Sequence, residues 1–345
     1  MQQLADHPVT RWWADRVREL GQRGTDLSDP QLAAATTHAA REAGLLQLPQ
    51  PGSAAGATRA RWSALAAMSA ADVTLAKLGE AHADAMVILS ELAGPADADP
   101  ELWAVWAAAP GSLRAQPTRS GWRLSGIKPW ASGSTCCQRA LITASAPDGQ
   151  RLFAVDVAAP GISRTEPSWA GLAMTGTATA TLALVDVAGD PVGEPGDYVG
   201  RPGFAHGGAG IAACWYGGAV GIARLLAERE TGAPDPHRDA HLGVVHAALT
   251  RARSSLDRVA DDIDASPDSD ATLWADTLRA VVESTAVEVI DRVGRALGPT
   301  PLALDRAHAR RVADLGLFLR QSHGEADLAR VGRAVAERGP AVAGW

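Results

Sequence analysis

The stretch Gly121–Ala144, with the sequence GWRLSGIKPWASGSTCCQRALITA, decides how the rest of the chain is interpreted. Its first residues alternate between apolar and polar side chains, which is typical of a half-buried β-strand. The motif Trp130-Ala131-Ser132-Gly133 leads into a second, apolar strand, Ala140–Ala144. An indole beside a small hydroxyl residue suits a flat aromatic ligand, because the ring offers a wall and the hydroxyl a polar contact. Taken alone, the residues favour a Trp packed in a β-sandwich core, so the rest of the chain has to decide.

The composition is that of a globular protein with more than one packed unit. The chain has 345 residues, of which 46% are hydrophobic, and a net charge of −7. This length exceeds one ordinary core, and the negative charge gives no general attraction to nucleic acid or to anionic membranes. We expect a cytoplasmic protein, because the charged N-terminal residues do not resemble a signal peptide. The longest uncharged run, Gly207–Ala223, is short for a membrane span.

The three cysteines are Cys136, Cys137 and Cys214, and their spacing fits neither a disulfide framework nor a metal site. Cys136 and Cys137 are interpreted as small core residues on opposite faces of a strand. The common metal-binding and nucleotide-binding motifs are missing from the sequence as well, so we expect no metal.

The hydrophobic period changes twice along the chain. A helical period over residues 1–110 predicts an N-terminal helical domain. A strand period over 111–200 predicts a middle β-domain that is mostly antiparallel, which disfavours a doubly wound nucleotide fold. The helical period returns over 201–345 and predicts a C-terminal four-helix bundle. The expected fold class is therefore α+β and mainly α, with these three domains.

Two short segments are assigned from their local pattern. Pro100–Ala109 is predicted to be a helix with Leu102, Trp103 and Trp106 on one side. The run Gly207–Gly210 is predicted to open a helix, where it either binds an anion or lets helices approach closely. The residues favour close helix packing.

Polar residues near the end of the last long helix are candidates for acid–base chemistry. His323 lies close in sequence to Glu325 and Asp327, and a His with two carboxylates can transfer protons. The same residues also suit a solvated helix junction with ion pairs, which the sequence alone favours. His82 and His206 are interpreted first as structural residues.

Together these features resemble the acyl-CoA dehydrogenase superfamily of flavoproteins over nearly the whole chain. The segment Gly126–Gly133, GIKPWASG, is similar to the flavin-binding strand of the family's middle domain. Ala170–Val187 is similar to the strand pair that follows, and Ala307–Glu325 is similar to an Arg- and Asp-containing segment near the C-terminus.

The resemblance implies a bound FAD and assigns residues to it. Trp130 is expected to pack against the flavin, and Ser132 to hydrogen-bond the reactive edge of the ring. Ala131 and Gly133 complete the implied cofactor-binding set.

Several family features are missing from the sequence. The loop before the first strand is reduced to Leu113–Arg119, without acidic or serine positions. The segment that binds the cofactor phosphates is not recognisable in Pro236–Gly243, where only Arg238 and Gly243 are reminiscent of it. No Glu stands at the position of the family's usual base. His323 and Glu325 are the nearest candidates for that catalytic role.

The leading functional hypothesis is an acyl-CoA dehydrogenase-like flavin oxidoreductase. It would remove an α-proton from an acyl thioester while a hydride passes to the flavin, and an external electron acceptor would then be needed. The first alternative is a flavin-dependent monooxygenase of the same fold acting on small aromatic or sulfur compounds, with His82 and His323 lining the pocket. The second alternative is a non-catalytic subunit that completes a partner's cofactor site. Under each hypothesis we expect a homo-oligomer or a heteromer with a related subunit, and binding to neither nucleic acid nor membranes.

Overall fold

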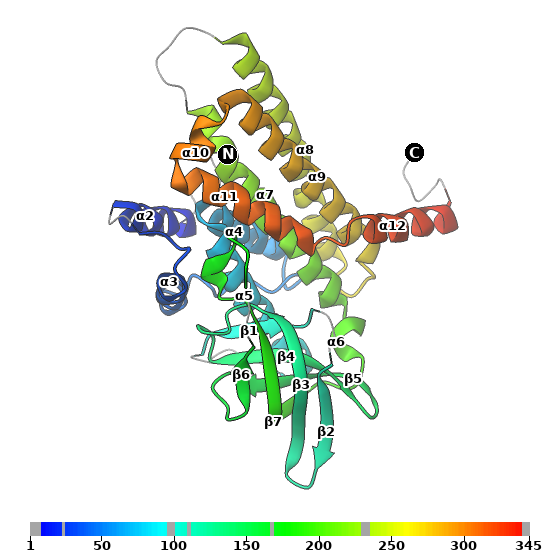
Figure 1. Cartoon of the computed structure of the whole chain (residues 1–345). Coiled ribbons are helices and arrows are strands. Elements are labelled where there is room, and N and C mark those ends of the chain that lie inside the picture. The colour runs from blue at the N-terminus through cyan, green and yellow to red at the C-terminus, as the bar shows by residue number, and fades with distance from the viewer. Residues whose placement is uncertain are drawn as a thin grey trace. The chain divides into compact units, whose positions relative to one another are not determined.

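The computed structural model describes residues 8–22, 25–94, 101–108, 112–165, 169–228 and 235–339. The chain divides into two compact units, and each unit is assembled from segments that are distant in the sequence (Figure 1). The first unit comprises 1–19, 49–76 and 205–345, and the second comprises 20–48 and 77–204. The expected three domains, with boundaries near residues 110 and 200, stay a prediction.

The first unit is built from helices. Those that lie wholly or mostly in it are α2 (Pro8–Gln22), α4 (Ala57–Ala71), α7 (Pro202–Ala227), α8 (Pro236–Ala265), α9 (Thr272–Leu297), α10 (Thr300–Leu304), α11 (Arg306–Phe318), the 3₁₀ turn η2 (Leu319–Gln321) and α12 (Glu325–Arg338). Helix α7 packs very closely against α4, because a Cβ atom at Gly217 would lie 2.1 Å from the carbonyl oxygen of Ala66. Only glycine allows this approach of the two backbones.

Helix α7 begins before its glycine-rich run. Since α7 starts at Pro202, the run Gly207–Gly210 lies inside the helix, and the anion-binding interpretation of this run as a helix N-terminus is wrong. Within the described segments, α7 alone has the length and apolar composition that a membrane-spanning helix requires, and 83% of its most apolar window is buried in the structure. A buried core helix meets the same criteria.

The second unit combines a β-sheet with helices. Its helices are α3 (Pro30–Glu42), most of α5 (Val73–Leu92) and α6 (Asp197–Gly200). Its remaining elements are β1 (Trp103–Trp106), β2 (Arg114–Thr118), β3 (Gly121–Ala131), β4 (Arg139–Ala146), β5 (Gly149–Asp156), β6 (Ile162–Arg164), the 3₁₀ turn η1 (Thr175–Thr177) and β7 (Ala180–Val192). The pairing order β4-β2-β3-β7-β5 returns from β5 to β4, so these strands close on themselves. Most of the pairings are antiparallel, as predicted, and β4 pairs in parallel with β1 and β2.

The prediction of a helix over Pro100–Ala109 is wrong. Trp103–Trp106 forms β1, which pairs in parallel with β4, and both tryptophans are buried. Trp and Val favour strands, and an exposed edge of β4 was available to pair with this short segment. The described part of the predicted helix is therefore held by a partner more than 30 residues further along the chain.

One face of the sheet is covered by α5. Ala85, Ile88 and Leu89 of the helix pack against Trp103 of β1 and Leu141 of β4, forming a buried apolar cluster. This cluster fixes β3 and β7 indirectly, because both strands are hydrogen-bonded into the same closed sheet.

Candidate functional site

The end of β3 turns an indole outward. A register shift between Lys128 and Ala131 interrupts the pairing of β3 with β7, and Trp130 within it has a φ of 62°, in the left-handed region. Its side chain is 57% exposed, while the neighbouring Ala131 is fully buried. A tryptophan rarely adopts such a backbone conformation, and strain of this kind is concentrated at functional sites.

Trp130 has an aromatic neighbour from another segment. The ring of Trp169 stands edge-on to it, with 6.0 Å between the ring centroids. The indole N–H of Trp169 donates to the carbonyl of Ala173 at 3.0 Å, which orders the Trp169–Ala173 segment. Leu172 of this segment is 93% exposed. The two indoles therefore form an apolar surface beside β3.

The backbone groups of the turn after Trp130 are hydrogen-bonded to other groups of the protein. The N–H of Ser132 donates to the carbonyl of Trp130 at 3.0 Å, and the N–H of Gly133 donates to the carbonyl of Thr177 at 2.7 Å. The carbonyl of Ser132 accepts from the indole N–H of Trp106 at 2.8 Å. Gly133 has a φ of 75°, and a Cβ atom there would lie 2.7 Å from Sγ of Cys137. The turn is therefore rigid, and its glycine is required.

A row of hydroxyl groups leads away from Ser132. Its Oγ lies 2.8 Å from Oγ1 of Thr179, which lies 2.7 Å from Oγ1 of Thr177. The hydroxyl of Thr177 donates to the carbonyl of Met174 at 2.7 Å. Met174 and Ala178, which flank the turn η1, have φ values of 56° and 47°. Two segments that are more than 40 residues apart thus form one polar and conformationally strained site.

The adjacent cysteines are arranged differently from the prediction. Cys136 and Cys137 follow β3 in a turn, with their Sγ atoms 3.8 Å apart, so their placement on opposite faces of a strand is wrong. The Nε2 atom of His38 lies 2.8 Å from the carbonyl oxygen of Cys136, and both thiols are buried. Hydrogen bonding to Cys136 and burial raise the pKa of the Cys137 thiol. Buried thiols of this kind are unreactive, which suits a structural role.

Lys128 lies in the sheet interior rather than on the surface beside Trp130. Its side chain is fully buried, and Nζ donates to Oγ1 of Thr143 at 2.9 Å. Burial lowers the pKa of Lys128 to about 8. The lysine shared with the family-like motif is therefore part of the core of the sheet.

His323 and Glu325 lie in the other unit, at the start of α12. The side chain of His323 is 75% exposed, and its Nδ1 lies 3.3 Å from Oδ1 of the buried Asp327. Burial acts to raise the pKa of Asp327, but its hydrogen bond with Arg330 at 2.6 Å and other interactions lower it overall. Glu325 is exposed and lines an open groove of about 850 Å³ between α9 and α12. These residues form a solvated junction rich in ion pairs.

The remaining polar candidates take part in packing. In the second unit, His82 is buried in α5, and its Nδ1 accepts the N–H of Trp103 at 3.2 Å. In the first unit, Arg310 bridges Asp72, at the end of α4, and Asp314, which accepts from its Nη1 at 2.9 Å. Asp72 and Asp314 are buried, so the Arg–Asp pair of the family-like segment has a structural role in holding α11.

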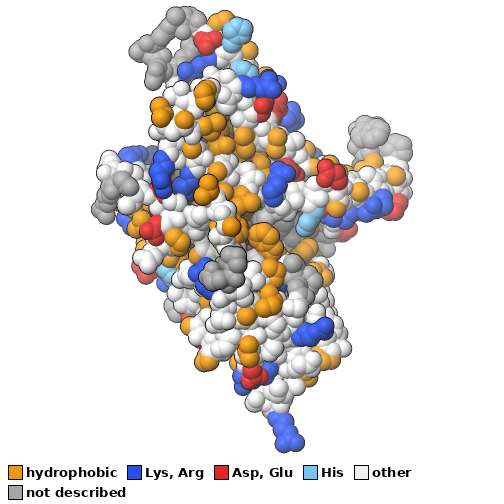
Figure 2. Space-filling model, in the orientation of Figure 1, with side chains coloured by type: hydrophobic (Ala, Val, Ile, Leu, Met, Phe, Trp, Pro, Cys, Tyr) orange, Lys and Arg blue, Asp and Glu red, His pale blue; other side chains and the backbone are white. Residues whose placement is uncertain are grey.

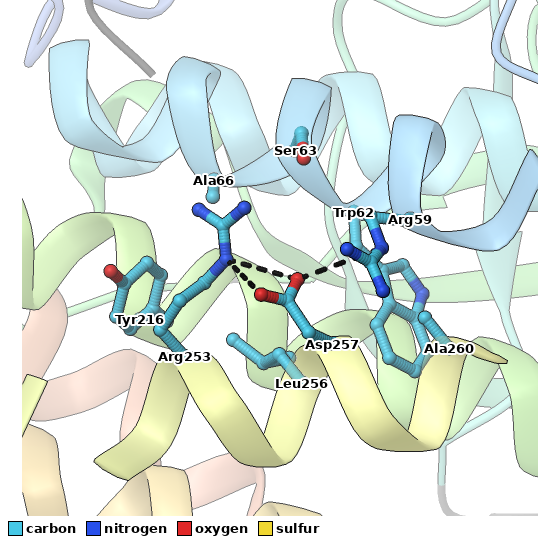
Figure 3. Close-up of a pocket in the computed structure, with 9 residues that line it drawn as sticks. All are labelled: Arg59, Trp62, Ser63, Ala66, Tyr216, Arg253, Leu256, Asp257 and Ala260. Carbon is cyan, nitrogen blue, oxygen red and sulfur yellow. Dashed lines mark hydrogen bonds and ion pairs between the residues drawn. The ribbon is translucent and has the colours of Figure 1, made fainter. Parts of the chain in front are cut away.

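A small cavity in the first unit lies between α4, α7 and α8 (Figure 3). Arg253 donates from Nε to both carboxylate oxygens of Asp257, at 3.0 and 2.9 Å, and Arg59 approaches the same carboxylate from α4. The cavity volume is about 20 Å³, which is the size of a single water site. It is too small for an organic substrate, and the ion pairs connect α4 to α8.

Charge and metal-ligand patterns give no further site among the described residues. On the face drawn in Figure 2, the coloured Lys and Arg side chains lie among Asp and Glu side chains rather than in one large region of a single sign. Within the described ranges, the structure has no group of three or more His, Cys, Asp or Glu residues placed to bind a metal.

Sequence reasoning located part of this site and missed the rest. It selected Trp130 and Ser132, but it did not select Thr177, Thr179 or Trp169. The alternating hydroxyl residues of the sequence TGTAT, 175–179, were a usable signal inside the family-like strand pair. Their contact with Ser132 depends on the pairing of β3 with β7 and was not predictable from either segment alone.

No family model and no curated protein matches this sequence. Solved structures do match it. TdsC, a dibenzothiophene monooxygenase from Paenibacillus sp., superposes in its FMN-bound form with a TM-score of 0.78 at 19% identity, covering 94% of each chain. The methanesulfinate monooxygenase MsuC from Pseudomonas fluorescens gives a TM-score of 0.75 at 17% identity, covering 98% of this chain and 97% of that one.

A dehydrogenase is similar to the same degree. Butyryl-CoA dehydrogenase from Megasphaera elsdenii gives a TM-score of 0.74 at 15% identity, covering 95% of this chain and 98% of that one. The predicted mainly helical chain with a sheet region is confirmed, and it has an acyl-CoA dehydrogenase-like fold. The three-domain layout stays a prediction. At these identities the likeness concerns the fold alone.

Proposed function

We propose that this chain is a flavin-dependent oxidoreductase whose cofactor ring stacks on Trp130. The observation that carries the proposal is the exposed indole of Trp130, held by a left-handed backbone next to the half-buried hydroxyl of Ser132. An exposed large aromatic ring in a strained conformation is costly unless a partner covers it. The planar ring of a flavin fits this surface, and Ala131 and Gly133 keep the backbone beside it compact.

Trp130 and its neighbours would contact the flavin ring in two ways, through an apolar wall and through a polar edge. Trp130 and the edge-on Trp169 provide an apolar wall that excludes water, while Ser132 provides a polar contact at the edge of the ring. When bound, the flavin supplies the electron-transfer chemistry. The protein contributes position and a hydrogen-bonding environment.

Of the two reactions, oxygenation of a small apolar compound is favoured, because neither candidate base has the surroundings that dehydrogenation requires. Dehydrogenation of an acyl thioester requires a base that abstracts a proton from the substrate, and such bases have their pKa adjusted by a desolvated pocket. His323 is largely exposed and paired with Asp327, and Glu325 is exposed, so neither has these surroundings. TdsC and MsuC, which are named as monooxygenases, share the fold over nearly the whole chain. Acyl-thioester dehydrogenation with His323 or Glu325 as the base is the competing proposal.

FMN suits this chain better than the FAD expected from the resemblance. Arg238, the residue reminiscent of the phosphate-binding segment, donates to the carbonyls of Leu226 and Glu228 at 3.2 and 2.9 Å. Because it binds the C-terminal end of α7, this guanidinium is already engaged. FMN carries a single phosphate and needs fewer such contacts, and one structure of TdsC contains FMN.

The test is the absorbance spectrum and turnover of the purified chain. We expect bound or added FMN to give a flavin spectrum. With chemically reduced FMN and O₂, we expect the chain to convert an aromatic or sulfur compound into its oxygenated product, which reduced FMN and O₂ without the chain should not form. A panel of acyl-CoAs with an artificial electron acceptor tests the competing reaction. Trp130→Ala should weaken flavin binding at least tenfold, whereas Trp274→Ala, which removes a partly exposed tryptophan of the other unit, should leave it unchanged. A colourless protein that binds neither FMN nor FAD would refute the proposal and favour a non-catalytic subunit. The molar mass in solution, measured for the purified chain by itself and then mixed with candidate related subunits, tests the proposed homo-oligomer or heteromer.

A further inference from the structure

We infer that Ser132 offers a hydrogen-bond acceptor, rather than a donor, to the flavin edge, so that this site binds reduced flavin more tightly than oxidised flavin. The inference rests on the proposed function and concerns the same site. It follows from counting the protons in the hydroxyl row that leads away from Ser132.

The direction of every hydrogen bond in the row is fixed at its inner end. The carbonyl oxygen of Met174 can only accept, so the single hydroxyl proton of Thr177 is donated to it at 2.7 Å. Oγ1 of Thr177 therefore accepts from Thr179 across 2.7 Å. Thr179 has then donated its own proton and accepts from Ser132 across 2.8 Å. The hydroxyl proton of Ser132 is used inside the protein, and lone pairs of its Oγ are left for a ligand.

The backbone of the turn gives no substitute donor at these two residues. The N–H of Ser132 donates to the carbonyl of Trp130, and the N–H of Gly133 donates to the carbonyl of Thr177. Thr177 and Thr179 are buried, so exchange of their protons with bulk water does not reorient the row freely. The turn thus presents an acceptor-rich edge.

The two redox states of flavin differ in what this edge can bind. In oxidised flavin the ring nitrogen at the reactive edge has a lone pair and no hydrogen, whereas in reduced flavin the same nitrogen carries a hydrogen. An acceptor pairs with the reduced form and opposes the lone pair of the oxidised form. This preference suits an enzyme that takes up flavin already reduced elsewhere. Thr177 and Thr179 act as positioning residues, because they set the proton direction of Ser132.

The test compares the affinities of one protein for the two forms of FMN. Dissociation constants are measured for oxidised FMN by fluorescence quenching and for reduced FMN anaerobically, and the midpoint potential of the bound flavin is measured independently. We expect the wild-type chain to bind reduced FMN more tightly. Thr179→Val removes the acceptor for the Ser132 proton and frees it to point outward, so the affinity ratio should shift roughly tenfold toward oxidised FMN. For a two-electron couple this corresponds to a potential about 30 mV lower.

Two variants separate proton direction from structural damage. Thr179→Ser keeps the hydroxyl and should retain the wild-type ratio. Thr175→Val removes a hydroxyl of the same turn that donates to the carbonyl of Ser28, outside the row, and should also leave the ratio unchanged. Thr177→Val should reproduce the shift if Thr179→Val does not fold. Tighter binding of oxidised FMN by the wild-type chain, or an unchanged ratio in a folded Thr179→Val, would overturn the inference while the proposed function stands. Failure to bind either form would refute the proposed function itself, and the inference with it.

Discussion

Substitution of Asp264 should destabilise the first unit by removing a cap that α8 provides to another helix. The N-cap residue of α4, Gly56, makes no side-chain hydrogen bond. The carboxylate of Asp264 takes its place, accepting from the N–H of Gly52 at 3.1 Å, from the N–H of Thr58 at 3.2 Å and from the Thr58 hydroxyl at 2.5 Å. Loss of a helix cap costs about 1 kcal/mol, and hydrogen bonds to a charged acceptor cost more. Because the site is half-buried and water replaces part of the loss, we expect Asp264→Ala to lower the free energy of unfolding by about 2–3 kcal/mol.

The measurement is urea unfolding followed by circular dichroism, with hydrogen exchange of the first turns of α4 as a local probe. Asp264→Asn keeps one acceptor oxygen and should lose about half as much. Asp268→Ala removes an exposed carboxylate from the neighbouring loop and should change stability by less than about 0.5 kcal/mol. If Asp264→Ala unfolds at the same urea concentration as Asp268→Ala, with unchanged exchange in α4, the capping argument is wrong.

Four further predictions concern the site and the buried charges. Trp130→Ala should weaken flavin binding at least tenfold with an unchanged melting temperature, because the lost indole is exposed; a large fall in melting temperature would contradict its assignment as a ligand wall. Gly133→Ala should cost about 1–3 kcal/mol, since φ is 75° and the new Cβ would lie 2.7 Å from Sγ of Cys137, and adding Cys137→Ala should recover part of it in thermal unfolding. Burial lowers the pKa of Lys128 from 10.5 to about 8, so between these values the unfolded chain binds more protons and stability rises with pH. Urea denaturation of the wild type and of Lys128→Met across that pH range should show the free energy of unfolding rising by up to about 3 kcal/mol in the wild type and not in the variant. Asp72→Asn should cost about 3 kcal/mol in urea unfolding, because it leaves the Arg310 guanidinium without one of its buried carboxylates, whereas the exposed Asp186→Asn should be neutral.

The sequence by itself determined most helices and strands, because their apolar residues repeat at short spacings along the chain. The helical period over 201–345 and the strand that carries Trp130 follow from spacings of 3.6 and 2 residues. The structure has the helices α7 to α12 and the strand β3 in these regions. The motif Trp130-Ala131-Ser132-Gly133 could also be selected from the sequence, because a strained turn requires particular residues such as the glycine at 133. The same local pattern failed for Trp103–Trp106, where two tryptophans at a helical spacing form a strand.

Tertiary structure decided which groups meet, and with them the chemistry of the site. Strand pairing brings Thr179 to Ser132 across 47 residues, and this contact joins Ser132 to the row of hydroxyl groups that sets the direction of its proton. Packing likewise engages Arg238 with the carbonyl of Glu228 at the end of α7. The physical reason is that periodicity depends on neighbours along the chain, whereas hydrogen-bond direction and burial depend on partners that only the folded sheet and bundle bring within 3 Å.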